Sequence, residues 1–181
     1  FVDPGRASDV RRGSRRAGAV LGAVCLASGL LGAACGGPER TSGRSGGAGP
    51  DCGVTPVDVV VSVAQWGSIV TELGGACANV TMIVHSAAVD PHEFEPSPAD
   101  AARFAGAALV VLNGAGYDRW ASKALDAVGG DPVVVSAAEV TDTPDGANPH
   151  LWYQPSAVRE VADEVTRRLT QLAPAASDVF A

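Results

Sequence analysis

Two of the three histidines in this chain follow the same pair of residues, an aspartate or asparagine and then a proline. His92 stands in "VDPHEFEPSP" (residues 89–98) and His150 stands in "NPHLWY" (residues 148–153). Proline stiffens each segment and so reduces the ordering cost of holding a side chain for a ligand. Because imidazole is a common ligand of transition metals, the pair predicts half of a metal site. The alternative is two ordinary surface histidines.

Neighbouring residues could support such a site. Asp90, Glu93 and Glu95 flank His92, and one of these carboxylates could orient an imidazole ring through its free N–H. Trp152 lies beside His150 and is expected to form a wall of the site. The third histidine, His85, lies seven residues before His92 and is interpreted mainly as a loop residue.

Other kinds of chemistry find little support in the sequence. The chain has no HExxH, CxxC or GxSxG motif, so a metalloprotease, a zinc ribbon and a serine hydrolase are not indicated. The formal net charge is −7, and an acidic body argues against binding to nucleic acid. A metal-dependent hydrolase would need an open metal position beside a general base, and no such group of residues is evident. We therefore expect no enzyme activity.

Strand and helix patterns alternate along the body of the chain. Short β-branched runs predict strands, and apolar residues at helical spacing predict helices between them. Ser97, Pro98 and Asp100 form a typical helix start. The predicted strands are 57–63, 79–85, 108–113 and 132–136, and the predicted helices are 64–75, 97–107, 117–129 and 156–172.

This alternation predicts an α/β fold with a parallel four-stranded sheet and helices on both faces. Ligands of such sheets bind at the carboxyl ends of the strands. His92 follows the second predicted strand and His150 follows the fourth. Both histidines are therefore expected at the same functional edge of the sheet.

The first 35 residues read as an export signal. Arginines precede the weakly apolar run "AGAVLGAVCLASGLLGAAC" (residues 17–35), as in a secretory signal peptide. "LGAAC" (residues 31–35) is similar to a lipobox, although Gly32 stands where leucine is usual. Cys35 is thus the expected lipidation site, which would anchor the protein to the outer face of the cell membrane. Plain secretion and an uncleaved membrane anchor are the alternatives.

Residues 36–53 are rich in glycine, serine and proline and are expected to form a flexible tether. Beyond it, an exported body would retain two cysteines, Cys52 and Cys77. Each comes just before a predicted strand, and neighbouring parallel strands would bring the two together. A disulfide is expected between them, with two buried thiols as the alternative.

Four segments together resemble a known family. "VVVSVAQWGSIVTELGG", "VDPHEFEPSPAD", "AALVVLNGAGYDRW" and "NPHLWYQPSAVREVADEV" are similar to the substrate-binding proteins of zinc and manganese ABC importers, the cluster A-I or ZnuA/TroA-like proteins, some of which were once called adhesins. The resemblance covers about residues 57–181. It implies a binding protein that delivers Zn²⁺ or Mn²⁺ to an ABC permease, with a surface adhesion lipoprotein as the alternative function.

The resemblance also implies a division of the metal site. In this family two α/β lobes close on one metal ion, and the first lobe supplies two histidines, which fall on His92 and His150. The second lobe supplies a histidine or glutamate and then an aspartate. Residues 54–181 are expected to be the first lobe, so two further ligands would lie beyond Ala181. "NPHLWY" resembles a zinc-binding group within the family, which favours zinc over manganese.

Overall fold

The computed structural model describes residues 52–180. The expected signal peptide at 1–35, the expected lipidation site Cys35 and the tether at 36–53, apart from its last two residues, lie outside the described residues. Within residues 52–180, no helix combines the length and the apolar character needed to cross a membrane.

The four strands form one parallel sheet. They are β1 (Val57–Val63), β2 (Ala78–Val84), β3 (Leu109–Leu112) and β4 (Val133–Ser136), in the spatial order β2–β1–β3–β4. Val59 of β1 pairs with Val80 on one side and with Leu109 on the other. The two inner strands are almost wholly buried, which explains their continuous runs of valine and leucine.

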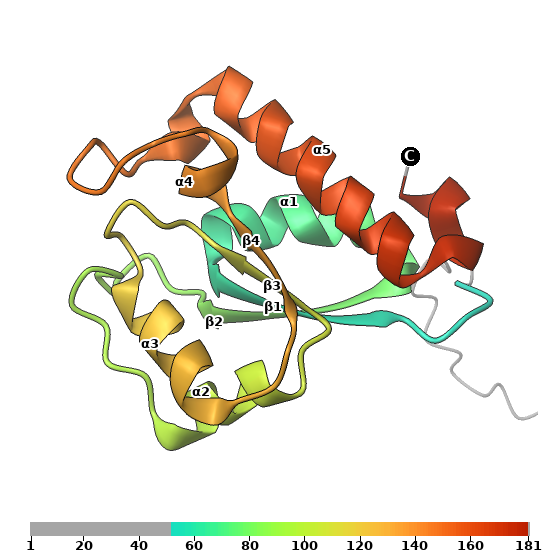
Figure 1. Ribbon diagram of the computed structural model, residues 1–181, viewed down its shortest axis with the longest axis horizontal. Coiled ribbons are helices and arrows are strands. Elements are labelled where there is room, and N and C mark those ends of the chain that lie inside the picture. Colours follow the sequence, from blue (N-terminus) through green and yellow to red (C-terminus); the bar gives the residue numbers. More distant parts are fainter. Residues whose placement is uncertain (1–51, 181) are drawn as a thin grey trace, which may run out of the picture. The chain divides into compact units, whose positions relative to one another are not determined.

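Helices cover both faces of the sheet, as the sequence predicts (Figure 1). Right-handed crossovers place α1 on one face and both α2 and α3 on the other, because the chain reverses its direction across the sheet after β2. The long α5 then packs against α1. The helices are α1 (Ala64–Gly74), α2 (Pro98–Ala105), α3 (Arg119–Val128), α4 (Ala137–Val140) and α5 (Pro155–Leu172), with 3₁₀ turns η1 (Gly75–Cys77), η2 (Leu151–Tyr153) and η3 (Pro174–Val179).

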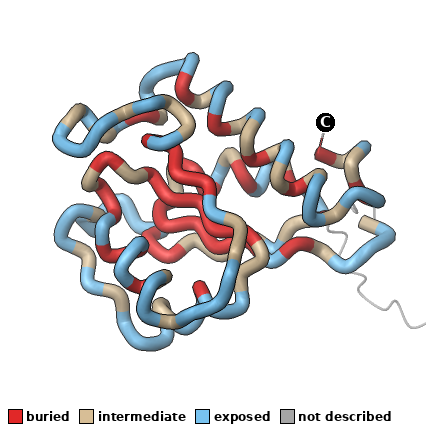
Figure 2. The backbone as a smooth tube through the Cα atoms, in the orientation of Figure 1, coloured by how far each residue is buried: buried red, intermediate tan, exposed pale blue. Residues whose placement is uncertain are grey.

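The core lies between the sheet and these helices, and the buried segments gather along the central strands (Figure 2). Trp66 of α1 and Phe104 of α2 are fully buried on opposite faces. On α5 the buried residues recur every fourth position, at Ala157, Val161, Val165 and Leu169. Leu172, the last residue of α5, is 36% exposed.

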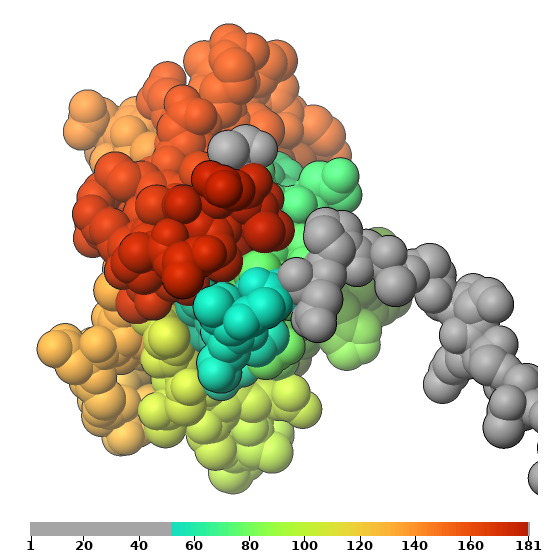
Figure 3. Space-filling model, turned by 90° about the vertical axis from the view of Figure 1, so that its right-hand side faces the viewer, coloured from blue at the N-terminus to red at the C-terminus, as the bar shows by residue number. Residues whose placement is uncertain are grey.

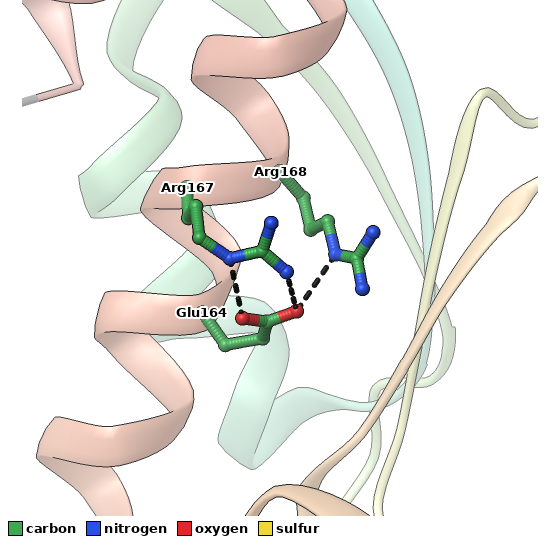
Figure 4. A network of polar contacts seen from close by, with 3 residues as sticks. All are labelled: Glu164, Arg167 and Arg168. Atoms are coloured by element: carbon green, nitrogen blue, oxygen red, sulfur yellow. Dashed lines mark hydrogen bonds and ion pairs between the residues drawn. The ribbon is translucent and has the colours of Figure 1, made fainter.

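The polar face of α5 carries a small ion network. The carboxylate of Glu164 accepts hydrogen bonds from Arg167 and from Arg168, one turn further along the helix (Figure 4). Hydrogen bonding from Arg167, assisted by Arg168, lowers the pKa of Glu164 below its ordinary value, although partial burial opposes this effect.

The described chain begins and ends at the edge where the strands start. A disulfide joins Cys52 to Cys77, the pair expected from the sequence, with their Cα atoms 4.9 Å apart. Cys77 closes η1, and η1 contacts η3 near the end of the described chain. Figure 3 shows this side of the molecule, where the segment that follows Cys52 lies beside the C-terminal residues.

Candidate metal centre

Three loops meet at the opposite edge of the sheet, where the strands end (Figure 1, left). Residues 85–97 connect β2 to α2 and carry His92, and residues 113–118 connect β3 to α3. Residues 141–150 connect α4 to η2 and end with His150. The structure therefore places both histidines at the same edge of the sheet, and both are exposed.

Each histidine ends the same kind of tight turn. The carboxylate of Asp90 accepts a hydrogen bond of 2.9 Å from the backbone N–H of His92. The side-chain oxygen of Asn148 accepts one of 3.1 Å from the backbone N–H of His150. Asparagine and aspartate favour such turns because their side chains bond to the backbone two residues on, and the proline between sets φ. The repeated Asx-Pro-His pattern thus has a common structural cause.

The ring of His150 is oriented as well as its backbone. Its Nδ1 lies 2.6 Å from the side-chain oxygen of Asn148. With Nδ1–H as the donor, the lone pair of Nε2 is left to bind a metal ion. The sequence pattern favours such an acceptor among the acidic residues beside His92. In the structure, Asp90 accepts a hydrogen bond from the backbone of His92. The acceptor that orients an imidazole ring is instead the side-chain amide oxygen of Asn148, which contacts His150.

Tyr117, which no motif in the sequence indicates, links the two histidines. Its ring centroid lies 4.7 Å from that of His92 and 5.8 Å from that of His150, in edge-to-face arrangements. Trp152 packs against both Tyr117 and His150, as a wall of the site should. Burial raises the pKa of Tyr117, and the nearby charge of Asp90 adds to the effect. The phenol is therefore neutral at physiological pH.

A buried polar network supports the β3–α3 loop that carries Tyr117. Asp118 is 1% exposed, and its carboxylate accepts hydrogen bonds from the hydroxyl of Ser62 at 2.5 Å and from the backbone N–H groups of Asn113 and Gly114 at 2.7 and 2.9 Å. The loop turns through three residues with positive φ, at 75°, 50° and 81° for residues 114–116. The network holds this backbone where β1 and β3 end, which is the switch point of the sheet.

Two histidines do not complete a metal site by themselves. In residues 52–180, no three His, Cys, Asp or Glu side chains are grouped so that they could hold a metal ion. His85 lines a hollow of about 650 Å³ with Asp90 and Tyr117, and its Nδ1 lies 3.3 Å from the carbonyl of Ile83. A larger hollow, about 790 Å³, lies beside α3 and is lined by neither His92 nor His150.

Residues 59–181 match the family described as ZnuA, zinc-uptake complex component A, periplasmic. The metal-dependent lipoprotein YcdH from Bacillus subtilis has the same fold, with a TM-score of 0.62 and 24% identity, over 68% of this chain and 47% of that one.

Two curated relatives are also similar in sequence to this chain. The manganese-binding lipoprotein MntA of Halalkalibacterium halodurans is 25% identical over 161 residues, which are 87% of this chain and 51% of the relative. The iron-binding protein YfeA of Yersinia pestis is 27% identical over 134 residues, 70% of this chain and 41% of the relative. This chain thus spans about half the length of these relatives. The family match covers more than half of this chain, and it shows that the chain belongs to the ZnuA family of periplasmic metal-uptake components.

Proposed function

We propose that this chain is an extracytoplasmic solute-binding protein that captures a divalent transition metal and delivers it to the permease of an ABC importer. The observation that carries the proposal is the pair of Asx-Pro-His turns, whose imidazoles both contact the ring of Tyr117 at one edge of the sheet. In this proposal the metal ion is bound through imidazole nitrogen atoms.

The chain supplies half of the metal site in this proposal. A closed zinc site usually has four protein ligands, and His92 and His150 provide two. We assign residues 54–181 to the first lobe of a two-lobe protein, in which the second lobe brings the remaining ligands. The relatives' greater length supports this division. Cys35 carries the lipid anchor, and residues 36–53 form the tether between membrane and lobe.

Zinc is the favoured metal and manganese the alternative. The description of the family refers to zinc uptake, whereas MntA is described as binding manganese and YfeA as binding iron. Two nitrogen ligands suit zinc better than manganese, which prefers oxygen ligands. The two ligands assigned to the second lobe would decide between the metals. MntA and YfeA are described as metal-binding proteins and YcdH as a metal-dependent lipoprotein, and none is described as an adhesin, so the adhesion alternative receives no support from them.

Isothermal titration of the full chain with Zn²⁺ and with Mn²⁺ tests the proposal. We expect zinc to bind weakly, with a dissociation constant of roughly micromolar or above, because two ligands alone leave a zinc ion largely hydrated. His92→Ala and His150→Ala should each abolish that binding. His85→Ala is the matched control and should leave it unchanged. Zinc binding that survives both substitutions would place the site elsewhere and remove the proposal's main support.

A further inference from the structure

The β3–α3 region contacts both histidine loops at equivalent points. The indole Nε1–H of Trp120, in the first turn of α3, donates a hydrogen bond of 3.0 Å to the carbonyl oxygen of Pro91. The amide Nδ2–H of Asn113, at the end of β3, donates one of 3.0 Å to the carbonyl oxygen of Pro149. Each proline directly precedes a proposed metal ligand. A side-chain donor therefore holds the peptide group that joins each proline to its histidine.

These two donors are far more deeply buried than the histidines. Asn113 is fully buried and Trp120 is 8% exposed. The side-chain oxygen of Asn113 accepts a hydrogen bond of 2.8 Å from the indole of Trp66, which fixes the direction of its amide. A buried side chain with a satisfied network has few alternative rotamers. Both histidines are exposed, so the bonds to Asn113 and Trp120 tie surface loops to the core.

We propose that Asn113 and Trp120 are positioning residues, which hold the two imidazoles at one fixed spacing by anchoring the carbonyl groups of Pro149 and Pro91. The consequence for metal binding rests on the function proposed above, whereas the spacing of the rings is a property of the metal-free chain. Neither residue touches the metal ion in this proposal.

Preorganisation is the physical reason for such an arrangement. A metal ion gains from a second imidazole only if both rings can reach it at once, and ordering a loose loop opposes that gain. Outer contacts that orient metal ligands commonly change affinity by about 10- to 100-fold. Loss of one anchor should therefore convert a two-imidazole site into one that binds through a single imidazole at a time.

The experiment compares the full chain with its Trp120→Phe variant, which keeps an aromatic ring and removes the donor. Without metal, nuclear Overhauser contacts from the ring of Tyr117 to each imidazole report the spacing directly. With Cu²⁺ as the probe, pulsed electron paramagnetic resonance counts the imidazoles bound to the ion. Phe104→Leu is the matched control, because it loosens packing beside Trp120 at a ring distance of 6.5 Å but leaves the indole donor in place.

In Trp120→Phe we expect the Tyr117–His92 contact to disappear and the Tyr117–His150 contact to remain. The number of bound imidazoles should fall from two to one, and the affinity for Cu²⁺ should fall about tenfold. Phe104→Leu should keep both contacts and both imidazoles. Asn113→Ala extends the test to the other loop, where the contact to His150 should be lost and that to His92 retained.

The outcomes separate this proposal from the function on which it rests. Unchanged contacts in Trp120→Phe, or the same loss in Phe104→Leu, would overturn the positioning role whatever the metal data show. If the unaltered chain shows both ring contacts but binds Cu²⁺ through neither imidazole, the proposed function fails. The contacts in the variants would still decide whether Asn113 and Trp120 set the spacing of the rings.

Discussion

At the scale of single residues, His150 is the more fully constrained of the two proposed ligands. The side-chain oxygen of Asn148 accepts hydrogen bonds from both the backbone N–H and the ring Nδ1–H of His150, whereas the carboxylate of Asp90 accepts one from the backbone N–H of His92. Its edge contacts with Tyr117 and Trp152 further restrict the ring. The site therefore has one ligand oriented by a polar acceptor and a second whose orientation depends on packing against Tyr117.

Asn148→Ala should weaken zinc binding to the full chain by about tenfold, because the ring of His150 loses the acceptor that selects its tautomer. Asn148→Asp is the matched control, since a carboxylate keeps an acceptor oxygen at the same place and should retain affinity. Isothermal titration of both variants measures the effect. Equal affinities for alanine and aspartate at this position would contradict the orienting role.

Asp118 has a different task, which is to hold the β3–α3 loop. Asp118→Ala should lower the free energy of unfolding by about 3 kcal/mol, because it leaves one hydroxyl and two backbone N–H groups buried without an acceptor. Ser62→Ala removes a single donor from the same carboxylate and should cost about 1 kcal/mol. Urea denaturation followed by circular dichroism measures both, and comparable losses in the two variants would argue against a central role for Asp118.

Sequence reasoning identifies part of this site and misses the rest for a physical reason. The two histidines stand out because each follows a proline that is itself preceded by an aspartate or an asparagine. Asn113, Tyr117 and Trp120 act through contacts with residues 25 to 36 positions away, such as the bond from Asn113 to Pro149. Spacing along the chain carries no sign of such contacts. Two positive-φ glycines around Ala115 are the local signal that could have drawn attention to this loop.

At the scale of elements, Glu164 gives α5 a stability that depends on pH. The pKa of Glu164 is lower in the folded state than in the unfolded state. Its contribution to the free energy of unfolding is therefore present above the ordinary carboxyl pKa and is lost as the pH falls through the folded-state pKa. Glu164→Gln should cost about 0.5 kcal/mol at pH 7 and almost nothing near pH 3. Glu160→Gln on the same helix is the control, because Glu160 makes no ion pair within residues 52–180. Thermal unfolding at both pH values checks this, and a pH-independent loss would contradict it.

The elements themselves follow closely from local patterns. All four predicted strands and all four predicted long helices are present, with ends that differ by one or two residues. The capping box at Ser97 and Asp100 forms as the residue types indicate. The exception is α4, whose four residues are too few to show a helical period. Its start depends on Ser136, whose hydroxyl accepts a hydrogen bond from the backbone N–H of Glu139.

At the scale of the whole molecule, the disulfide closes the chain around the first βα unit. Cys52 and Cys77 are 25 residues apart, and a cross-link of that length removes conformational freedom from the unfolded chain worth about 3 kcal/mol. Replacing both cysteines by alanine should lower the free energy of unfolding by about that amount. Denaturation of the unaltered chain under reducing conditions is the control and should match the double variant. An unchanged midpoint would contradict a stabilising bond.

The sheet order explains why residues so distant in sequence share one site. The chain leaves β1 toward β2 and leaves β3 toward β4, in opposite directions across the sheet. A crevice opens where such strands end, and the loops around it converge. The sequence predicts a shared edge from the alternation of strands and helices alone. Apart from the β1–β2 pairing suggested by the two cysteines, it does not predict which strands are neighbours, because that depends on how the layers pack.

The placement of the described ends, Cys52 and Phe180, has a practical consequence. Both lie at the edge where the strands start, whereas the histidines lie where the strands finish. A fluorophore or an affinity handle attached at this edge, for example at the exposed Val54, would thus lie on the far side of the sheet from His92 and His150. Immobilisation through such a position leaves both imidazoles free for measurement of metal exchange.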